Sequence, residues 1–187
     1  WEYFDSRFKI RKKYKSFKNN NLVNYKVNNI KNFNNTNKIL ILREQGIGEE
    51  ILFSSIYNDV IKKFNNVKIE TDERLIKIFE NSFGKKIFFP EGFFSNNSLK
   101  LNNFDHILYA GSLLKLFRQN EKSFLNKPYL ISANKKIQYF KKKLSKFDKN
   151  LKIGISWKSV LNIYGNLKSL QIHFFSKIFN KNRKIIN

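Results

Sequence analysis

The sequence predicts an α/β protein built on a Rossmann-like parallel sheet with helices on both faces. Two observations predict it. The run Ile39 to Leu42 is apolar at four successive positions, which is typical of a strand covered on both sides, as in parallel sheets. After this run, short apolar segments alternate with segments of helical period, and this alternation favours parallel strands joined by helices.

The expected elements follow this alternation along the chain. The expected strands span 38–42, 67–70, 86–89, 106–110 and 151–157. The expected helices span 49–64, 73–83, 112–117, 135–147 and 169–179. Apolar residues recur with a helical period in these last segments, and Pro90 ends the third strand.

Three regions are expected from this pattern. Residues 1–37, whose second half is rich in Asn, are interpreted as a lead-in and linker that follow a preceding region. Residues 38–150 are expected to form the Rossmann-like domain, and residues 151–187 the start of a second domain. Because the chain has no methionine, even at position 1, we expect a piece of a longer protein whose second domain is truncated.

Composition disfavours several kinds of site. The 187 residues include no cysteine and two histidines, which excludes disulfides and thiolate metal sites and disfavours a multi-histidine site. No metal is expected. No apolar run approaches the ~20 residues that a bilayer-spanning helix needs, and the first residues lack a signal-peptide pattern. A cytoplasmic location is therefore expected.

The net charge of +23 invites a nucleic-acid-binding interpretation. Arginine, the residue that contacts bases and phosphates bidentately, occupies only positions 7, 11, 43, 74, 118 and 183. Lysine, asparagine, isoleucine and phenylalanine all have A/T-rich codons, so a base bias of the genome accounts for the charge. No specific nucleic-acid partner is expected. A basic nucleic-acid-binding domain is kept as an interpretation that ranks behind the two functions described below.

A glycine-containing turn follows the first strand. Gly46 and Gly48 separate that strand from a helix, an arrangement that places ligands at the carboxyl end of a sheet. Ile51 stands where a dinucleotide-binding fingerprint has its third glycine, and no Lys-Ser or Lys-Thr pair follows Gly48. The turn is therefore neither a complete dinucleotide fingerprint nor a P-loop, and no cofactor is expected.

Three carboxylates flank these glycines, namely Glu44, Glu49 and Glu50. A carboxylate at the mouth of a sheet can act as general base toward a sugar hydroxyl. Alternatively, Glu49 and Glu50 only favour the helix N-terminus, by about 0.3–1 kcal/mol. Because one residue turns a helix by about 100°, we expect these two to face different ways.

The segment at 43–53, Arg-Glu-Gln-Gly-Ile-Gly-Glu-Glu-Ile-Leu-Phe, resembles the EQGxGDxIxF motif of bacterial tetratricopeptide-repeat proteins that carry a glycosyltransferase-like region. Those regions are related to the heptosyltransferases of glycosyltransferase family nine, which have the two-domain GT-B fold. Residues 1–8, 70–75 and 151–158 resemble, in turn, the segment that follows the repeats, the second strand with its loop, and the start of the second GT-B domain.

The resemblance implies the N-terminal half of a GT-B transferase, which mainly holds the acceptor. The reaction would move a sugar from a nucleotide-sugar, a substrate rather than a cofactor, to a hydroxyl of a glycan or protein. Glu49 is implied as the catalytic base, in place of the aspartate that the family usually has. Gln45, Gly46 and Gly48 are implied to bind substrate, and the fragment alone is expected to be inactive.

Three residues near the start of the second domain complete the expected site. Ser156 and Trp157 end the expected strand and are expected to line the cleft between the domains. The resemblance implies that Lys168 contacts the donor phosphates, where the related heptosyltransferases have a lysine. Trp157 as a core residue and Lys168 as a solvated lysine remain alternatives. The second overall interpretation is a non-catalytic interaction module of the same fold, with protein partners bound through an upstream repeat region.

Overall fold

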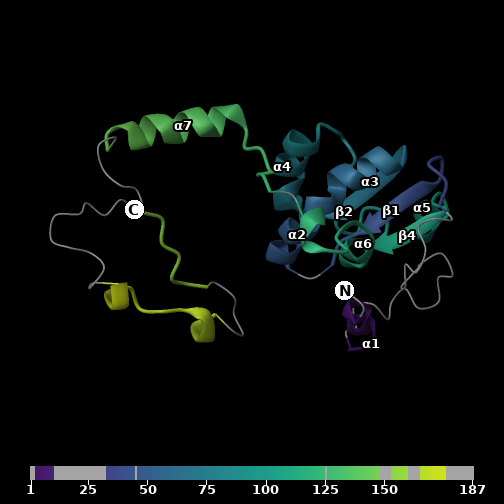
Figure 1. The fold of residues 1–187 in the computed structure, drawn as a ribbon, viewed down its shortest axis with the longest axis horizontal. Coiled ribbons are helices and arrows are strands. Elements are labelled where there is room, and N and C mark those ends of the chain that lie inside the picture. The colour runs from purple at the N-terminus through teal and green to yellow at the C-terminus, as the bar shows by residue number, and fades with distance from the viewer. Residues whose placement is uncertain are drawn as a thin grey trace. The chain divides into compact units, whose positions relative to one another are not determined.

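The computed structural model describes residues 3–10, 33–44, 46–124, 126–147, 153–159 and 165–175. The chain divides into two compact units, 1–138 and 139–187. The first unit contains the sheet with its helices (Figure 1). The domain limits expected at 38 and 151 stay predictions.

The first unit is built on a four-stranded parallel sheet. Its strands are β1 (Lys38–Leu42), β2 (Asn66–Thr71), β3 (Phe88–Pro90) and β4 (His106–Tyr109). Their order is β3-β2-β1-β4, and every neighbouring pair is parallel. The predicted fold class is therefore confirmed, and β1 lies in the centre of the sheet.

Helices connect these strands as the sequence predicts, with some differences in length. The predicted helix at 49–64 is divided into three consecutive pieces, and short helices also form at the lead-in and after β3. The helices are η1 (Phe4–Ser6), α1 (Arg7–Ile10), α2 (Ile47–Phe53), η4 (Ser54–Ile56), α3 (Tyr57–Lys63), α4 (Glu73–Phe83), α5 (Ser98–Leu101), α6 (Ala110–Phe117), η5 (Glu121–Ser123) and α7 (Asn134–Ser145).

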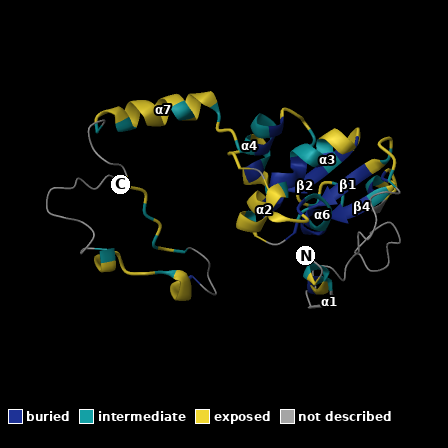
Figure 2. Ribbon diagram, viewed as in Figure 1, coloured by how far each residue is buried: buried dark blue, intermediate teal, exposed yellow. Residues whose placement is uncertain are grey.

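Two apolar clusters explain why β1 is apolar at every position from Ile39 onward. Successive side chains of a strand point to opposite faces of the sheet. Ile39 and Ile41 pack with side chains of α2, α3, α4 and α6 on one face. Leu40 and Leu42 pack on the other face with Leu101 of α5 and with Phe8 of the lead-in. Figure 2 shows buried residues gathered on the strands.

Local signals fix the ends of α4. The Asp72 side chain accepts a hydrogen bond from the backbone N–H of Arg74, at 3.0 Å, and so satisfies a donor of the first turn. Gly84 follows the helix with φ of +63°, the left-handed conformation that glycine adopts without steric cost. The predicted limits of this helix agree with the structure.

The second unit differs from its predicted elements. No strand forms over 153–157, the described part of the expected strand at 151–157. Of the helix expected at 169–179, residues 169–175 are described, and they form only a 3₁₀ helix at Ile172–Phe175; a further 3₁₀ helix precedes them at Asn166–Lys168. A strand requires a hydrogen-bonded neighbour. Among the described residues, one backbone hydrogen bond links 153–157 to another segment, from Leu170 N–H to Trp157 O at 2.8 Å.

The long basic helix α7 buries no side chain (Figure 2). Tyr139 and Phe140 are both more than half exposed. None of the helices in the described ranges combines the length and apolar character that crossing a bilayer requires.

Candidate functional site

Charged side chains gather where the parallel strands end. Glu44 follows β1, Asp72 follows β2, and Glu91 follows β3. Because the strands are parallel, these positions share one side of the sheet, which we call the carboxyl edge. The first turn of α2, which carries Glu49 and Glu50, begins at the same edge.

Glu44 is fully buried and joins three parts of the chain. Its Oε2 accepts from Arg7 Nε at 2.6 Å, and its Oε1 accepts from Arg7 Nη2 at 2.8 Å. The same Oε1 accepts from the backbone N–H of Gly111, at the start of α6, at 2.6 Å. The carboxylate therefore ties the lead-in and α6 to the end of β1.

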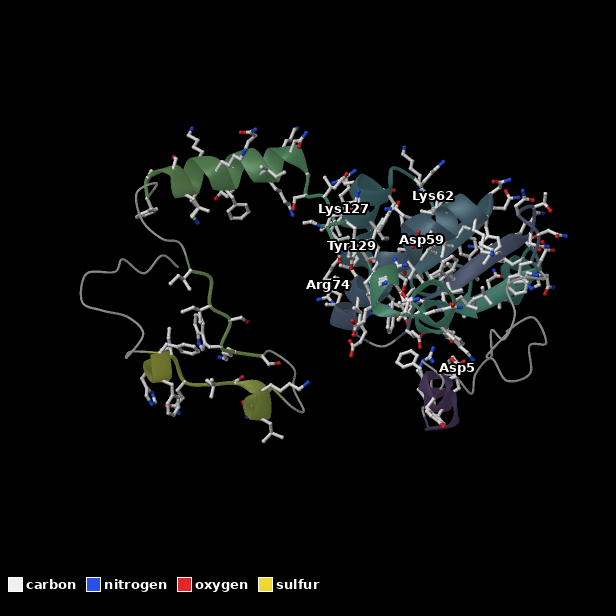
Figure 3. The ribbon with its side chains drawn as sticks, in the orientation of Figure 1. Asp5, Asp59, Lys62, Arg74, Lys127 and Tyr129 are labelled. Carbon is white, nitrogen blue, oxygen red and sulfur yellow. The ribbon has the colours of Figure 1, made fainter. Side chains whose placement is uncertain are left out.

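Arg7 is held by further contacts, both within the lead-in and to α6. Its guanidinium carbon lies 4.2 Å from the ring centroid of Phe4 and 4.1 Å from that of Phe8. Nη1 donates to Asp5 Oδ1 at 2.9 Å, and Nη2 donates to Ser112 Oγ at 2.9 Å. Figure 3 labels Asp5 on this short helical segment. Sequence reasoning treated the segment as part of a lead-in and missed Arg7, whose flanking aromatic residues were the available signal.

Glu50 forms a second buried tie, on the other side of β1. Its Oε2 accepts from Thr71 Oγ1 at 2.6 Å and from the Asp72 backbone N–H at 2.9 Å. Its Oε1 pairs with Arg43, which also bonds Asp72 at 3.1 Å and pairs with Glu91. The first turn of α2 is thereby fixed to the end of β2.

These contacts shift the ionisation of two groups. Burial opposes the charge of Arg43, but the hydrogen bonds and charges of Glu50 and Glu91 outweigh burial and raise the pKa of Arg43. The side-chain hydrogen bonds from Arg74 lower the pKa of Asp72 to about 2. Both groups are therefore charged at neutral pH.

Glu49 differs from Glu44 and Glu50 because its side chain is exposed. Its carboxylate lies back over the turn: a Cβ on Gly46 would stand 3.0 Å from Glu49 Oε2. The expectation that Glu49 and Glu50 face different ways is confirmed. Gly48 lies in the first turn of α2 with open space around the position of a Cβ. Gln45, the fourth expected residue of this turn, lies outside the described residues.

The other expected site residues belong to the second unit. Ser156 and Lys168 are exposed, and Trp157 is half-buried. The hydrogen bond from Leu170 N–H to Trp157 O connects the two described segments that carry them. The structure thus brings Gly46, Gly48 and Glu49 together in the first unit, and each unit carries its own part of the predicted set.

Glu70 is a buried carboxylate whose contacts sequence reasoning missed. It accepts hydrogen bonds from the backbone N–H groups of Phe94 and Ser95, at 2.7 and 2.8 Å, and from Ser95 Oγ at 2.7 Å. The N–H of Gly92 adds a bond of 3.2 Å. Glu70 thereby holds the loop after β3 against β2.

A hollow of about 530 Å³ lies at the ends of α3 and α6, away from the glycine turn. It is lined by Asp59, Lys62, Lys63, Leu116, Phe117, Arg118 and Ser123; Asp59 and Lys62 are labelled in Figure 3. Arg118 Nη1 donates to Asp59 Oδ2 at 2.8 Å, so Arg118 braces α6 against α3. Within the described ranges, no group of three or more potential ligand side chains is arranged to hold a metal ion.

Comparison with known proteins gives one distant relative. The chain is similar to Protein FlbA of Caulobacter vibrioides, with 23% identity over 136 residues, which covers 66% of this chain and 23% of that protein. The chain therefore spans less than a quarter of the length of this relative. No family model matches the chain, and no solved structure matches it.

Proposed function

We propose that this chain is the acceptor-binding part of a GT-B-like glycosyltransferase, with Glu49 as the general base that activates an acceptor hydroxyl. One observation carries the proposal: of the three carboxylates that flank the glycine turn, Glu44 and Glu50 are buried and Glu49 is exposed. The resemblance of the segment at 43–53 to the motif of a transferase family supplies the reaction class.

The other two carboxylates are poor candidates for a general base. Glu44 is engaged by Arg7 and by the Gly111 N–H, and Glu50 by Arg43 and Thr71. A general base must come within about 2.6–3.2 Å of the hydroxyl whose proton it takes. Only a side chain with access to solvent can approach a bound sugar in this way, which favours Glu49 among the three.

Gly48 supports a ligand at the same place. Glycine in a helix is less favourable than alanine by roughly 0.5–1 kcal/mol. A Cβ on Gly48 would meet open space, so packing does not require glycine here. The φ angle of Gly48 is not positive, so the backbone conformation does not require glycine either. A bare backbone surface next to Glu49 is explained if a substrate approaches it closely.

In this proposal the donor is a nucleotide-sugar, and it contacts the second unit. Lys168 is exposed, so its ammonium group is accessible to a diphosphate, whose charge it would stabilise as the nucleotide departs. Ser156 and Trp157 are the proposed neighbours of the donor. The acceptor, a glycan or a protein, would bind at the turn that carries Glu49.

A second candidate function is a non-catalytic interaction module. The observation that favours it is the number of charged groups at the carboxyl edge that are bound to one another, such as Arg7 with Glu44 and Arg43 with Glu50. These pairs stabilise the edge as a structural joint. A module of this kind would keep the fold without turnover.

The test uses the full-length protein, incubated with a panel of nucleotide-sugars and cellular glycan or protein acceptors. Nucleotide release is measured for Glu49→Gln and for a matched control, Glu73→Gln, which removes an exposed carboxylate from the first turn of α4. Loss of a general base should lower turnover by about 10²–10⁴-fold in Glu49→Gln alone. Equal activity of the two variants would remove the base assignment, and absence of turnover in the unmodified protein would favour the module.

A further inference from the structure

The order of the strands marks the point of the sheet at which folds of this class bind ligands. β1 has β2 on one side and β4 on the other, so the direction in which the sheet grows reverses between β1 and β4. Open α/β sheets bind ligands in the crevice outside the carboxyl ends of their strands at such a switch point. In this chain the guanidinium of Arg7 lies at this point, bonded to Glu44 after β1 and to Ser112 after β4, and we call the residues that surround it the crevice.

The sheet domain supplies the floor of this crevice. Glu44 comes from the end of β1, and Gly111 and Ser112 come from the first turn of α6, directly after β4. A Cβ on Gly111 would stand 2.7 Å from Glu44 Oε1 and 2.7 Å from Phe4 Cε1. Glycine is therefore required at position 111 for the floor to accept its occupant.

Aromatic side chains of the sheet domain form the walls. Phe4 contacts Phe53 edge to face, with ring centroids 6.1 Å apart, and Phe8 contacts Tyr109 at 5.1 Å. Phe53 and Tyr109 are both buried. The segment at 3–10 thus brings a cation between two rings, and the domain offers a carboxylate together with two further rings.

We propose that the crevice between β1 and β4 is a receptor for an arginine side chain, and that residues 3–10 are a strap that fills it from within the same chain. The ligand class follows from the floor. A carboxylate that receives Nε and Nη2 in parallel recognises the planar fork of a guanidinium, which lysine cannot reproduce. A buried carboxylate also repels phosphate, so nucleotides are excluded from this crevice.

The floor of the receptor does not depend on the strap, because Glu44, Gly111 and Ser112 belong to the sheet domain and not to residues 3–10. Residues 11–32 join the strap to the sheet domain. A strap that left the crevice would stay attached to the domain through these residues. This inference is independent of the proposed transferase activity.

The test is chemical rescue in the complete chain. Arg7→Ala removes the guanidinium but leaves the floor intact, and methylguanidinium is then added at millimolar concentrations that do not denature proteins. We expect a saturable shift of the Gly111 amide resonance and a saturable rise in Tm, with binding at least tenfold tighter than to the unmodified chain. Arg74→Ala, which removes an exposed arginine instead, should bind as weakly as the unmodified chain.

Two controls define the chemistry. Arg7→Ala combined with Glu44→Gln should abolish the rescue, and methylammonium, which lacks the fork, should bind Arg7→Ala at least tenfold more weakly. If Arg7→Ala does not fold, Phe4→Ala keeps both charges of the pair and weakens the strap, so methylguanidinium should compete with Arg7. A folded variant of either kind that binds methylguanidinium no better than the unmodified chain would overturn the proposal.

Discussion

Two arginine–glutamate pairs flank the end of β1, and they do different things. Arg7 and Glu44 are 37 residues apart in sequence, whereas Arg43 and Glu50 are seven apart. The first pair attaches a remote segment on the β4 side. The second pair joins the end of β1 to the first turn of α2 and to the end of β2, on the opposite side of β1. The same two residue types thus serve as an anchor in one place and as a local brace in the other.

Burial and surroundings separate the pairs further. Arg7 is enclosed by Phe4 and Phe8, and Glu44 is fully buried. Arg43 is more exposed and shares its charge with Asp72 and Glu91. Removing one partner of the more deeply buried pair leaves a charge that water cannot reach, whereas the more exposed Arg43 stays in contact with solvent. The anchor should therefore be much more sensitive to a single substitution than the brace.

The largest effect is expected from Glu44→Gln, which removes the fully buried carboxylate that receives two hydrogen bonds from the Arg7 guanidinium. The free energy of unfolding should fall by about 3–5 kcal/mol. Urea denaturation measures this loss. Arg7→Gln combined with Glu44→Gln should lose less than the sum of the two single variants, because the pair is coupled. Additive losses would mean that the two side chains do not act as a pair.

A smaller loss is expected from Glu50→Gln on the brace side. The amide can still accept from Thr71 and from the Asp72 N–H, but it no longer pairs with Arg43, so about 1–3 kcal/mol of stability should be lost. The exposed Glu49→Gln is the matched comparison and should change stability by less than about 0.5 kcal/mol. Equal losses for the two variants would contradict the different burial of Glu49 and Glu50.

The smallest effect is the pH dependence that Asp72 contributes on the side of the brace. The hydrogen bonds from Arg74 lower the pKa of Asp72 to about 2, below that of an unfolded aspartate. A carboxylate whose pKa is lowered by folding stabilises the folded state above about pH 4, and this contribution is lost as the pH falls from about 4 toward 2. Denaturation curves across this range should therefore show a steeper decline for the unmodified chain than for Asp72→Asn, in which asparagine keeps the helix cap. Parallel declines would show that Asp72 does not supply this dependence.

The sequence predicted the centre of the sheet well because the signals there are local. The unbroken apolar run at 39–42 requires cover on both faces, and Asp72 and Gly84 mark the ends of α4 through their own backbone and capping chemistry. Four-residue α5 was missed because one helical turn carries no detectable period. The strand expected at 151–157 was wrong over its described part, since an apolar run forms a strand only beside a pairing partner.

The candidate site was predictable in kind but not in detail. The sequence showed three carboxylates around the glycine turn, and the spacing of Glu49 and Glu50 indicated different directions. It could not show which of them is buried, because that depends on Thr71 and Arg43 meeting Glu50 in space. The contact of Arg7 with Glu44 was beyond reach for the same reason, since no local pattern identifies a partner 37 residues away.

The contacts of Arg7 also determine when its segment can dock during synthesis of the chain. Ser112, which accepts from its guanidinium, lies 105 residues further along the chain. At about 5–20 residues per second, a ribosome needs roughly 5–20 seconds to travel that distance. Until then Phe8 lacks Tyr109 and Arg7 lacks Ser112, so the strap cannot complete its contacts with β4 and α6. The strap can therefore dock completely only after β4 and α6 have been synthesised, although it lies at the N-terminal end of the described residues.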